Sequence, residues 1–498
     1  MPSHAKRRTS KTVRHEQDSI GTKIIPANSY TGIFSARAHE NFSLSTRRFP
    51  ISFYHGLALL KQVAAQEHVH AGRLPEKEGN AIVRAAQEVQ RGKFDELFDL
   101  DVFQAGAGTP LNMMMNEIIA NRALEMLGER KGKYARIHPN IHVNMAQSTN
   151  DVIPTALRLT TLSYSAHLEK ELMETIHAAE ELSRHYRTTS KTGRTHLQTA
   201  VPVTFGQELY VYAQSLREDW QSIRSTKEKM HELSLGGTAV GTGITAEPGY
   251  DVAVVKRLRS ETGIPFYPSH RKMYHTSHMS VFQRYSDALS TLASDLLIWM
   301  NDWILLGSDP YAGIGEIHLP EVEPGSSIMP GKINPSILEA MKMIALHVQG
   351  NHETIRLSCE ATQLELNVMT PVMGSNLFES QELLTNGLKM FREKCLKKIR
   401  PTPRMNMLLQ QSVSTATALN PYLGYDVVAF MVKKAMANHV SVEKIIRAEG
   451  LLTPTEIEKI MRPENLTRPQ KTDEKLAQTI QARATYKKIR ARVQKFAR

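Results

Sequence analysis

Three long stretches of helical period constrain the fold of this chain more than any other feature. In the first, apolar residues recur at three- and four-residue spacing: Leu168, Leu172, Ile176, Ala179 and Leu182. The second carries Phe282, Ala288, Leu289, Leu292, Leu296, Met300 and Trp303, and the third Leu338, Met341, Ile344 and Val348. Strand-like alternation is scarce. The pattern predicts an all-α bundle whose long helices bury apolar faces against each other or against other subunits.

Size and cysteine content narrow the class of protein. A chain of 498 residues is long enough for about three domains. Its two cysteines, Cys359 and Cys395, exclude a disulfide framework and indicate a reducing compartment. No apolar run approaches the roughly 20 residues that span a bilayer, and the N-terminus lacks the apolar core of a signal peptide. We therefore expect a soluble, cytoplasmic protein without a membrane partner.

The net charge of +12 raises the question of a nucleic-acid partner. Much of this charge lies at the chain ends: Lys6-Arg7-Arg8, Lys11 and Arg14, and then Lys487, Lys488, Arg490, Arg492, Lys495 and Arg498. No zinc-finger spacing or aromatic RNA-binding motif accompanies these residues. We interpret them as solvated tails or a helix face and expect no specific nucleic-acid partner, although a cationic field also attracts small dicarboxylates.

A polar loop, Pro324–Pro335 followed by Glu339, is the densest cluster of functional groups. It combines two hydroxyls, an ammonium and a carboxamide with glycines that let backbone N–H groups approach an anion. Five residues separate Gly325 from Gly331 and Ile333 follows Lys332, which excludes a phosphate-binding P-loop. An ordinary surface turn is the alternative. The density of polar groups favours an irregular loop that holds a carboxylate.

Two other segments have a similar polar composition. Gln147–Asp151 is rich in hydroxyls and amides and predicts an N-cap into the helix after Pro154. Gly193–Gln198 places Thr195 and His196 side by side; for this histidine, structural and functional interpretations stay equally open.

Two further stretches are given structural interpretations. Met113-Met114-Met115 is interpreted as packing. Gly106–Thr109 is only faintly like a dinucleotide fingerprint, because Leu111 occupies the place of the third glycine and no strong strand precedes it.

Taken in their order along the chain, these segments resemble those of the fumarase and aspartase superfamily. The resemblance extends from about Arg14 to about Pro469. The most specific match is Gly325–Asn334, with the sequence GSSIMPGKIN. The other matches are Ala105–Thr109, Asn116-Glu117, Ala120–Ala123, His138–Asn140 through Asp151, Gly193–Gln198, Gly237–Gly243, Glu365–Met369, Leu419–Pro421 and Gly424-Tyr425.

The resemblance implies an all-helical homotetramer with three domains per subunit and one central bundle of long helices shared by four chains. On this chain the domains are expected at residues 14–150, 151–402 and 403–469, with a basic N-terminal tail (1–13) and a basic C-terminal extension (470–498). The active sites would be composite: the segments around Thr109 and Ser148, around Thr195 and His196, and the Ser326 loop would come from different subunits.

The resemblance also implies a reaction, the reversible anti elimination of a leaving group from a four-carbon dicarboxylate to give fumarate. No organic cofactor or metal is expected. Ser326 would be the base, acting as an oxyanion. The other implied roles are hydrogen bonds to the carboxylate whose charge grows (Thr109, Ser148, Thr149, Ser327), binding of the second carboxylate (Thr195, Lys332, Asn334), contact with the leaving group (Asn150, His196) and pairing with His196 (Glu339).

A few short segments bear on which leaving group the resemblance implies. Thr149, Gln104–Thr109 and Glu360–Met369 are similar to aspartases, which favours ammonia from L-aspartate. Leu235–Thr238, Gly424–Asp426 and Arg462–Glu464 are more similar to fumarases, which keeps water as the alternative. Departures from the family pattern, Met114, Thr199 and Thr245 and a lack of acidic residues in Tyr274–Phe282, also leave open a paralogue with another substrate. An inactive tetrameric scaffold is disfavoured by the intact Ser326, Lys332, Asn334 and His196.

Overall fold

The computed structural model describes residues 12–496, and in this range it is mainly helical. The longer helices are α1 (Ile33–Asn41), α2 (Ile51–His70), α3 (Glu76–Gln90), α4 (Thr109–Met126), α5 (Thr149–His185), α6 (Phe205–Lys227), α7 (Tyr250–Thr262), α9 (Ser280–Leu306), α10 (Ser336–Glu360), α11 (Thr370–Lys394), α12 (Pro403–Gln411), α14 (Tyr425–Ala437), α18 (Glu474–Ala482) and α19 (Ala484–Phe496). The shorter ones are α8 (Lys272–Ser277), α13 (Asn420–Leu423), α15 (Val442–Ala448), α16 (Pro454–Ile460) and α17 (Pro463–Leu466).

The strands of the described residues form only two-stranded pairs. These are β1 (Val13–Asp18) with β2 (Gly21–Pro26), β3 (Ser190–Thr195) with β4 (Gln198–Thr204), β5 (Glu232–Leu233) with β6 (Tyr267–Pro268), and β7 (Ile317–His318) with β8 (Arg400–Pro401). The predicted all-α class is confirmed.

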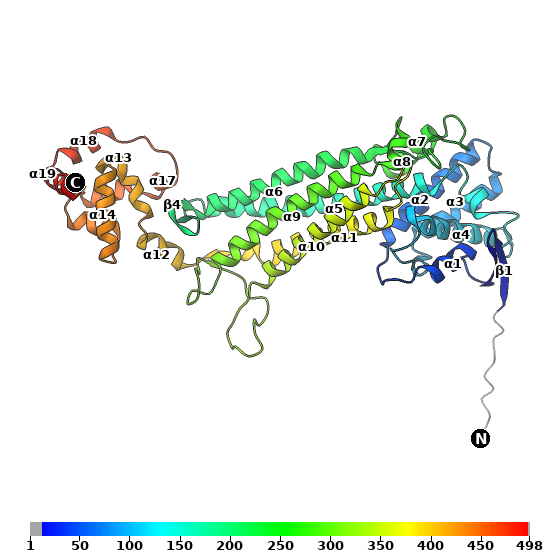
Figure 1. The fold of residues 1–498 in the computed structure, drawn as a ribbon, viewed down its shortest axis with the longest axis horizontal. Helices are drawn as coiled ribbons and strands as arrows, with labels where there is room; N and C mark the ends of the chain where they lie inside the picture. Colours follow the sequence, from blue (N-terminus) through cyan, green and yellow to red (C-terminus); the bar gives the residue numbers. More distant parts are fainter. Residues whose placement is uncertain (1–11, 497–498) are drawn as a thin grey trace, which may run out of the picture. The chain divides into compact units, whose positions relative to one another are not determined.

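The chain divides into two compact units. Unit 1 comprises the residues up to Lys170 together with Asp219–Ala293 and Ile344–Thr385; unit 2 comprises Glu171–Glu218, Ser294–Met343 and the residues from Asn386 onward. The bounds of α5, α6, α9, α10 and α11, which are labelled in Figure 1, each include residues of both units. This division differs from the three predicted domains, whose boundaries, like the tetramer, stay predictions.

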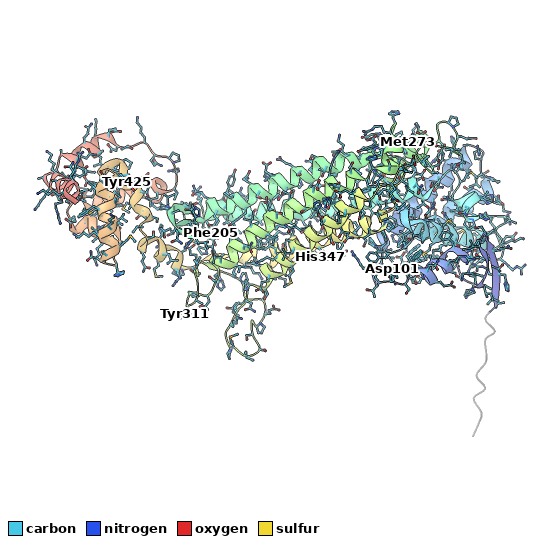
Figure 2. All side chains as sticks on the ribbon, viewed as in Figure 1. Asp101, Phe205, Met273, Tyr311, His347 and Tyr425 are labelled. Carbon is cyan, nitrogen blue, oxygen red and sulfur yellow. The ribbon has the colours of Figure 1, made fainter. Side chains whose placement is uncertain are left out.

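The three predicted helical runs are confirmed as α5, α9 and α10. In unit 1, the Gln381 amide of α11 donates to the Thr161 carbonyl of α5 at 3.0 Å and to the Tyr285 hydroxyl of α9 at 2.9 Å. In unit 2, the Trp299 ring of α9 stacks on Tyr212 of α6 with centroids 4.9 Å apart. Side chains thus fill the space between the long helices within each unit (Figure 2).

One predicted boundary is wrong: α5 begins at Thr149, before Pro154 and not after it. The Ser148 hydroxyl accepts the Asn150 N–H at 3.2 Å, and the Asp151 carboxylate accepts the Ser148 N–H at 2.9 Å. These reciprocal bonds satisfy N–H groups that a helix start leaves without partners, so the helix can begin there. As a result, Ser148, Thr149 and Asn150 lie at a helix N-terminus.

The structure also tests the predictions for the methionine run, the glycine-rich turn and the two cysteines. Met113, Met114 and Met115 are buried in α4, which confirms their packing role. Gly106–Gly108 forms a 3₁₀ turn ahead of α4 and follows no strand, which excludes a dinucleotide fingerprint. Cys359 and Cys395 are free thiols. Within residues 12–496, the helices lack the combination of length and apolarity that crossing a bilayer requires.

The basic C-terminal segment folds onto a core. Ile480, Tyr486, Ile489 and Val493 of α18 and α19 belong to one hydrophobic cluster that also contains Leu419, Met431 and Ile446. Five cations of α19 lie on its exposed side: Lys487, Lys488, Arg490, Arg492 and Lys495. At this end the helix-face interpretation is confirmed. The N-terminal cluster Lys6-Arg7-Arg8 with Lys11, and Arg498, lie outside the described residues.

Candidate active site

Two helix N-termini meet in unit 1. Thr109 is the first residue of α4, behind Gly108, and Ser148–Asn150 begins α5. Asn112, one turn into α4, donates its amide to the Thr149 hydroxyl at 3.2 Å and so joins the two helix starts. Because free N–H groups make helix N-termini favourable for anions, this arrangement suits a carboxylate.

Asp151 clamps the start of α5 to a neighbouring turn. Its fully buried carboxylate accepts the N–H groups of Gly236 and Thr238, each at 3.1 Å, in addition to that of Ser148. Beside it, the Asn150 amide NH₂ donates to the Ala239 carbonyl at 2.6 Å. A carbonyl can only accept, which fixes the orientation of this amide. Oδ1 of Asn150 is therefore the atom available to a ligand that donates.

Lys61 is a fully buried cation that the sequence did not single out. Its Nζ donates to Asn144 Oδ1 at 2.8 Å and to Gln147 Oε1 at 3.0 Å, which supports the segment just before the α5 cap. Burial lowers the pKa of Lys61 to about 7 and raises the pKa of Asp151 to about 6, because desolvation outweighs the attraction between the two groups. The only sequence signal was a lysine inside an apolar helical run.

We expect Lys61 to make stability depend on pH. An unfolded lysine has a pKa near ~10.4, so between pH 7 and about 10 the unfolded chain binds a proton that the folded chain has released. The free energy of unfolding therefore rises with pH in this window. Relative to Lys61→Met, wild type should gain about 1 kcal/mol per pH unit between about pH 7 and 9 in urea unfolding. A difference that is constant with pH would contradict the assignment.

In unit 2, Gly193–Gln198 forms the tip of the β3–β4 hairpin. Thr195 pairs with Gln198, and the two residues between them, His196 and Leu197, have φ of 54° and 58°. Two left-handed residues make a type I′ turn, which normally takes asparagine and glycine. A bulky leucine there stores strain, typically about 1–3 kcal/mol, and such strain persists only where the surroundings hold the backbone.

The Pro324–Pro335 loop is irregular, as predicted. The Ser326 hydroxyl oxygen accepts the N–H groups of Ile328 at 3.2 Å and Met329 at 3.0 Å. Gly325 donates its N–H to the Lys332 carbonyl at 2.9 Å, and a Cβ on Gly325 would lie 2.4 Å from that oxygen. Gly331 has φ of 82°. Glycine is therefore needed at both positions to close the loop around Ser326.

A cavity of about 1020 Å³ in unit 2 is lined by Lys332, Asn334 and Glu339. Asn334 also donates its amide to the Gly325 carbonyl at 2.7 Å, a loop-closing contact. Tyr311, on the loop between α9 and β7 (Figure 2), is another residue that lines the cavity. Ser326, Ser327, Thr195 and His196 do not line this cavity.

The predicted residues are divided between the two units. Unit 1 holds Thr109, Ser148, Thr149 and Asn150, and unit 2 holds Thr195, His196, Ser326, Ser327, Lys332, Asn334 and Glu339. Across residues 12–496, no hydrogen bond or ion pair joins Glu339 to His196. Their pairing, the catalytic roles and the sharing of a site between subunits stay predictions.

Comparison with known proteins decides the family. The model of a lyase family matches residues 21–350, and that of the fumarase C C-terminus matches residues 416–468. The chain belongs to the fumarase and aspartase superfamily of lyases. The family matches thus span both the Ser326 loop and the C-terminal helices.

Relatives in this superfamily carry two different names. An aspartate ammonia-lyase of Bacillus subtilis is 41% identical over 90% of this chain and 94% of its own length. A class II fumarate hydratase of Pseudomonas aeruginosa is 42% identical over 85% of this chain and 92% of its own.

Two solved structures share the fold. The fumarate lyase:delta crystallin from Brucella melitensis bound to cobalt gives a TM-score of 0.89 at 39% identity over 92% of this chain and all of that one. A class II fumarase from Schistosoma mansoni gives 0.86 at 33% identity, with the same coverage.

Proposed function

We propose that the protein is an aspartate ammonia-lyase, which reversibly eliminates ammonia from L-aspartate to give fumarate through an aci-carboxylate. The elimination is supported by the two backbone N–H groups that point at the Ser326 hydroxyl oxygen. Hydrogen bonds to the charged form of a group favour that form, so these donors stabilise a serine oxyanion.

The difficult step is removal of a proton from the carbon next to a carboxylate, because it adds a second negative charge to that group. In the proposal, Ser326 takes the proton. Thr109, Ser148, Thr149 and Ser327 donate to the growing charge. Removing one donor aimed at a developing charge typically costs roughly 3–4 kcal/mol of transition-state stabilisation. The positive ends of α4 and α5 add to this effect.

The other groups orient the substrate. Thr195, Lys332 and Asn334 bind the second carboxylate, so that the base and the leaving group lie on opposite faces of the substrate. His196, with Glu339 as its partner, lies beside the leaving group. The groups come from different chains of a homotetramer, as the resemblance implies.

The choice of ammonia rests on Asn150. One N–H of its amide donates to the Ala239 carbonyl, which fixes the amide orientation and leaves Oδ1 to accept from the substrate; a protonated amine offers three donors. A protonated amine also leaves without an added proton, whereas hydroxide must be protonated as it leaves. Aspartate ammonia-lyases among the relatives, at 40–43% identity, agree with this choice.

Fumarate hydratase is the second candidate. It is favoured by the fumarase-like Leu235–Thr238, which supplies two of the N–H groups that hold Asp151, and by relatives named fumarate hydratase at 39–42% identity.

One assay separates the two candidates. Purified protein is offered L-aspartate and, separately, L-malate, and the ultraviolet absorbance of fumarate is followed. We expect fumarate from aspartate and none from malate. Fumarate from malate alone would assign the hydratase activity, and fumarate from neither would refute both and leave a paralogue with another substrate.

A further inference from the structure

Glu316 is a buried carboxylate in unit 2 that has no part in the proposed chemistry. Its side chain has no exposed surface, and two cations contact it. Arg194 holds it with two parallel bonds, Nη2 to Oε1 at 2.6 Å and Nη1 to Oε2 at 3.0 Å, and Lys191 Nζ lies 3.3 Å from Oε2. A bidentate arginine–carboxylate pair fixes direction as well as distance.

The cluster extends to a second carboxylate. Lys191 is 2% exposed and also bonds Glu208 of α6 at 2.6 Å. Burial raises the pKa of Glu208. The two parallel bonds make Glu316 the carboxylate that compensates the charge of Arg194. Removing one partner from such a buried cluster leaves another charge without compensation.

Both cations lie on β3, the strand that leads to the hairpin tip. Arg194 directly precedes Thr195, and the tip holds His196 and Leu197 in the left-handed region. This conformation costs free energy, above all at Leu197, and it persists where the surroundings hold the backbone. The bond from Arg194 to Glu316 supplies such support at the residue that precedes the Thr195–Gln198 turn.

Glu316 is also fixed on its own side. Its N–H donates to the Leu306 carbonyl at 2.8 Å, and its carbonyl accepts from Thr402 at 2.9 Å. The strand β7, which pairs with β8, follows immediately and leads into the Pro324–Pro335 loop. A single side chain therefore joins the hairpin tip to the anchored start of the segment that carries Ser326.

We propose that Glu316 is a positioning residue that sets the orientation of Thr195 and His196. It acts through Arg194 and does not touch the substrate. The kinetic consequence rests on the proposed function, because it requires Thr195 and His196 to contact a dicarboxylate. The structural consequence, a fixed hairpin tip, does not.

The test compares Glu316→Gln with wild type in the full-length protein, using whichever substrate yields fumarate. We expect kcat to fall at least ~10-fold with KM changed less than ~3-fold, because a displacement of about 1 Å can cost up to ~100-fold in rate. Glu316→Asp, which keeps the carboxylate, should recover part of the loss.

The matched control is Glu171→Gln in the same unit. Glu171 forms a largely buried pair with Arg392 at 2.6 Å, and Arg392 also contacts Glu174 and Glu393. Neither Glu171 nor Arg392 is adjacent to a proposed site residue. We expect a measurable loss of melting temperature, no larger than that of Glu316→Gln, with kcat and KM within ~2-fold of wild type. An equal loss of kcat in this control, or Glu316→Asp behaving like Glu316→Gln, would assign Glu316 a purely structural role and overturn the proposal.

A crystal structure of Glu316→Gln tests whether Glu316 holds the hairpin turn, even if the wild-type protein acts on neither substrate. We expect the Thr195–Gln198 turn to be displaced or to leave its left-handed conformation while β7 and β8 remain paired. An unchanged turn would overturn the proposal, whereas inactivity of wild type with a displaced turn would count against the proposed reaction alone.

Discussion

Ser326→Ala is expected to lower kcat by about 10³-fold or more. Without the hydroxyl no oxyanion can form between the N–H groups of Ile328 and Met329, and a positioned base typically contributes ~10²- to 10⁴-fold. The measurement is the rate of fumarate formation at saturating substrate, with the assembly state checked on a sizing column. The elution volume should be that of wild type.

Ser441→Ala provides the control for this variant. Ser441 also accepts a backbone N–H, from Lys444 at the start of α15, but it lies in the C-terminal helices. Losing this cap should lower stability by about 1 kcal/mol and leave the rate unchanged. If Ser326→Ala instead turned over at nearly the wild-type rate, another group would have to be the base.

Asp151→Ala is expected to lower the free energy of unfolding by about 3–5 kcal/mol. The substitution leaves three backbone N–H groups without an acceptor and removes the counter-charge of the buried Lys61. Urea unfolding at fixed protein concentration measures it. Asp99→Ala, at a carboxylate whose side chain is 62% exposed, should change stability by less than about 1 kcal/mol.

This variant also links stability to the site. Asp151 fixes the start of α5 against Gly236 and Thr238, so its loss should release Asn150 from Ala239 and reduce activity in the fraction that remains folded. A stability change below about 1 kcal/mol would mean that water or neighbouring groups replace the carboxylate.

The features predicted correctly from the sequence are those that nearby residues determine. Apolar spacing indicated α5, α9 and α10, because a helix buries residues three and four positions apart. The irregular Ser326 loop followed from its glycines and prolines. The prediction for the start of α5 is wrong because it rests on Pro154, whereas the cap formed by Ser148 and Asp151 determines where the helix begins.

The supporting charges could not be predicted, because their partners are distant in the sequence. Lys61 and Gln147 are 86 residues apart, and Arg194 and Glu316 are 122 residues apart. Lysine, glutamine, arginine and glutamate side chains usually lie in solvent, so the sequence alone does not indicate that these residues are buried or paired. Only the fold buries Lys61 and Glu316 and thereby makes their partners obligatory.

The five helices that run uninterrupted through both units have a consequence for cooperativity. A chain cleaved at the boundary between units would acquire new helix ends in α5, α6, α9, α10 and α11, each with backbone groups that have lost their intrahelical bonds. We therefore expect that neither half folds by itself. Melting that starts in one half should spread into the other along these shared backbones.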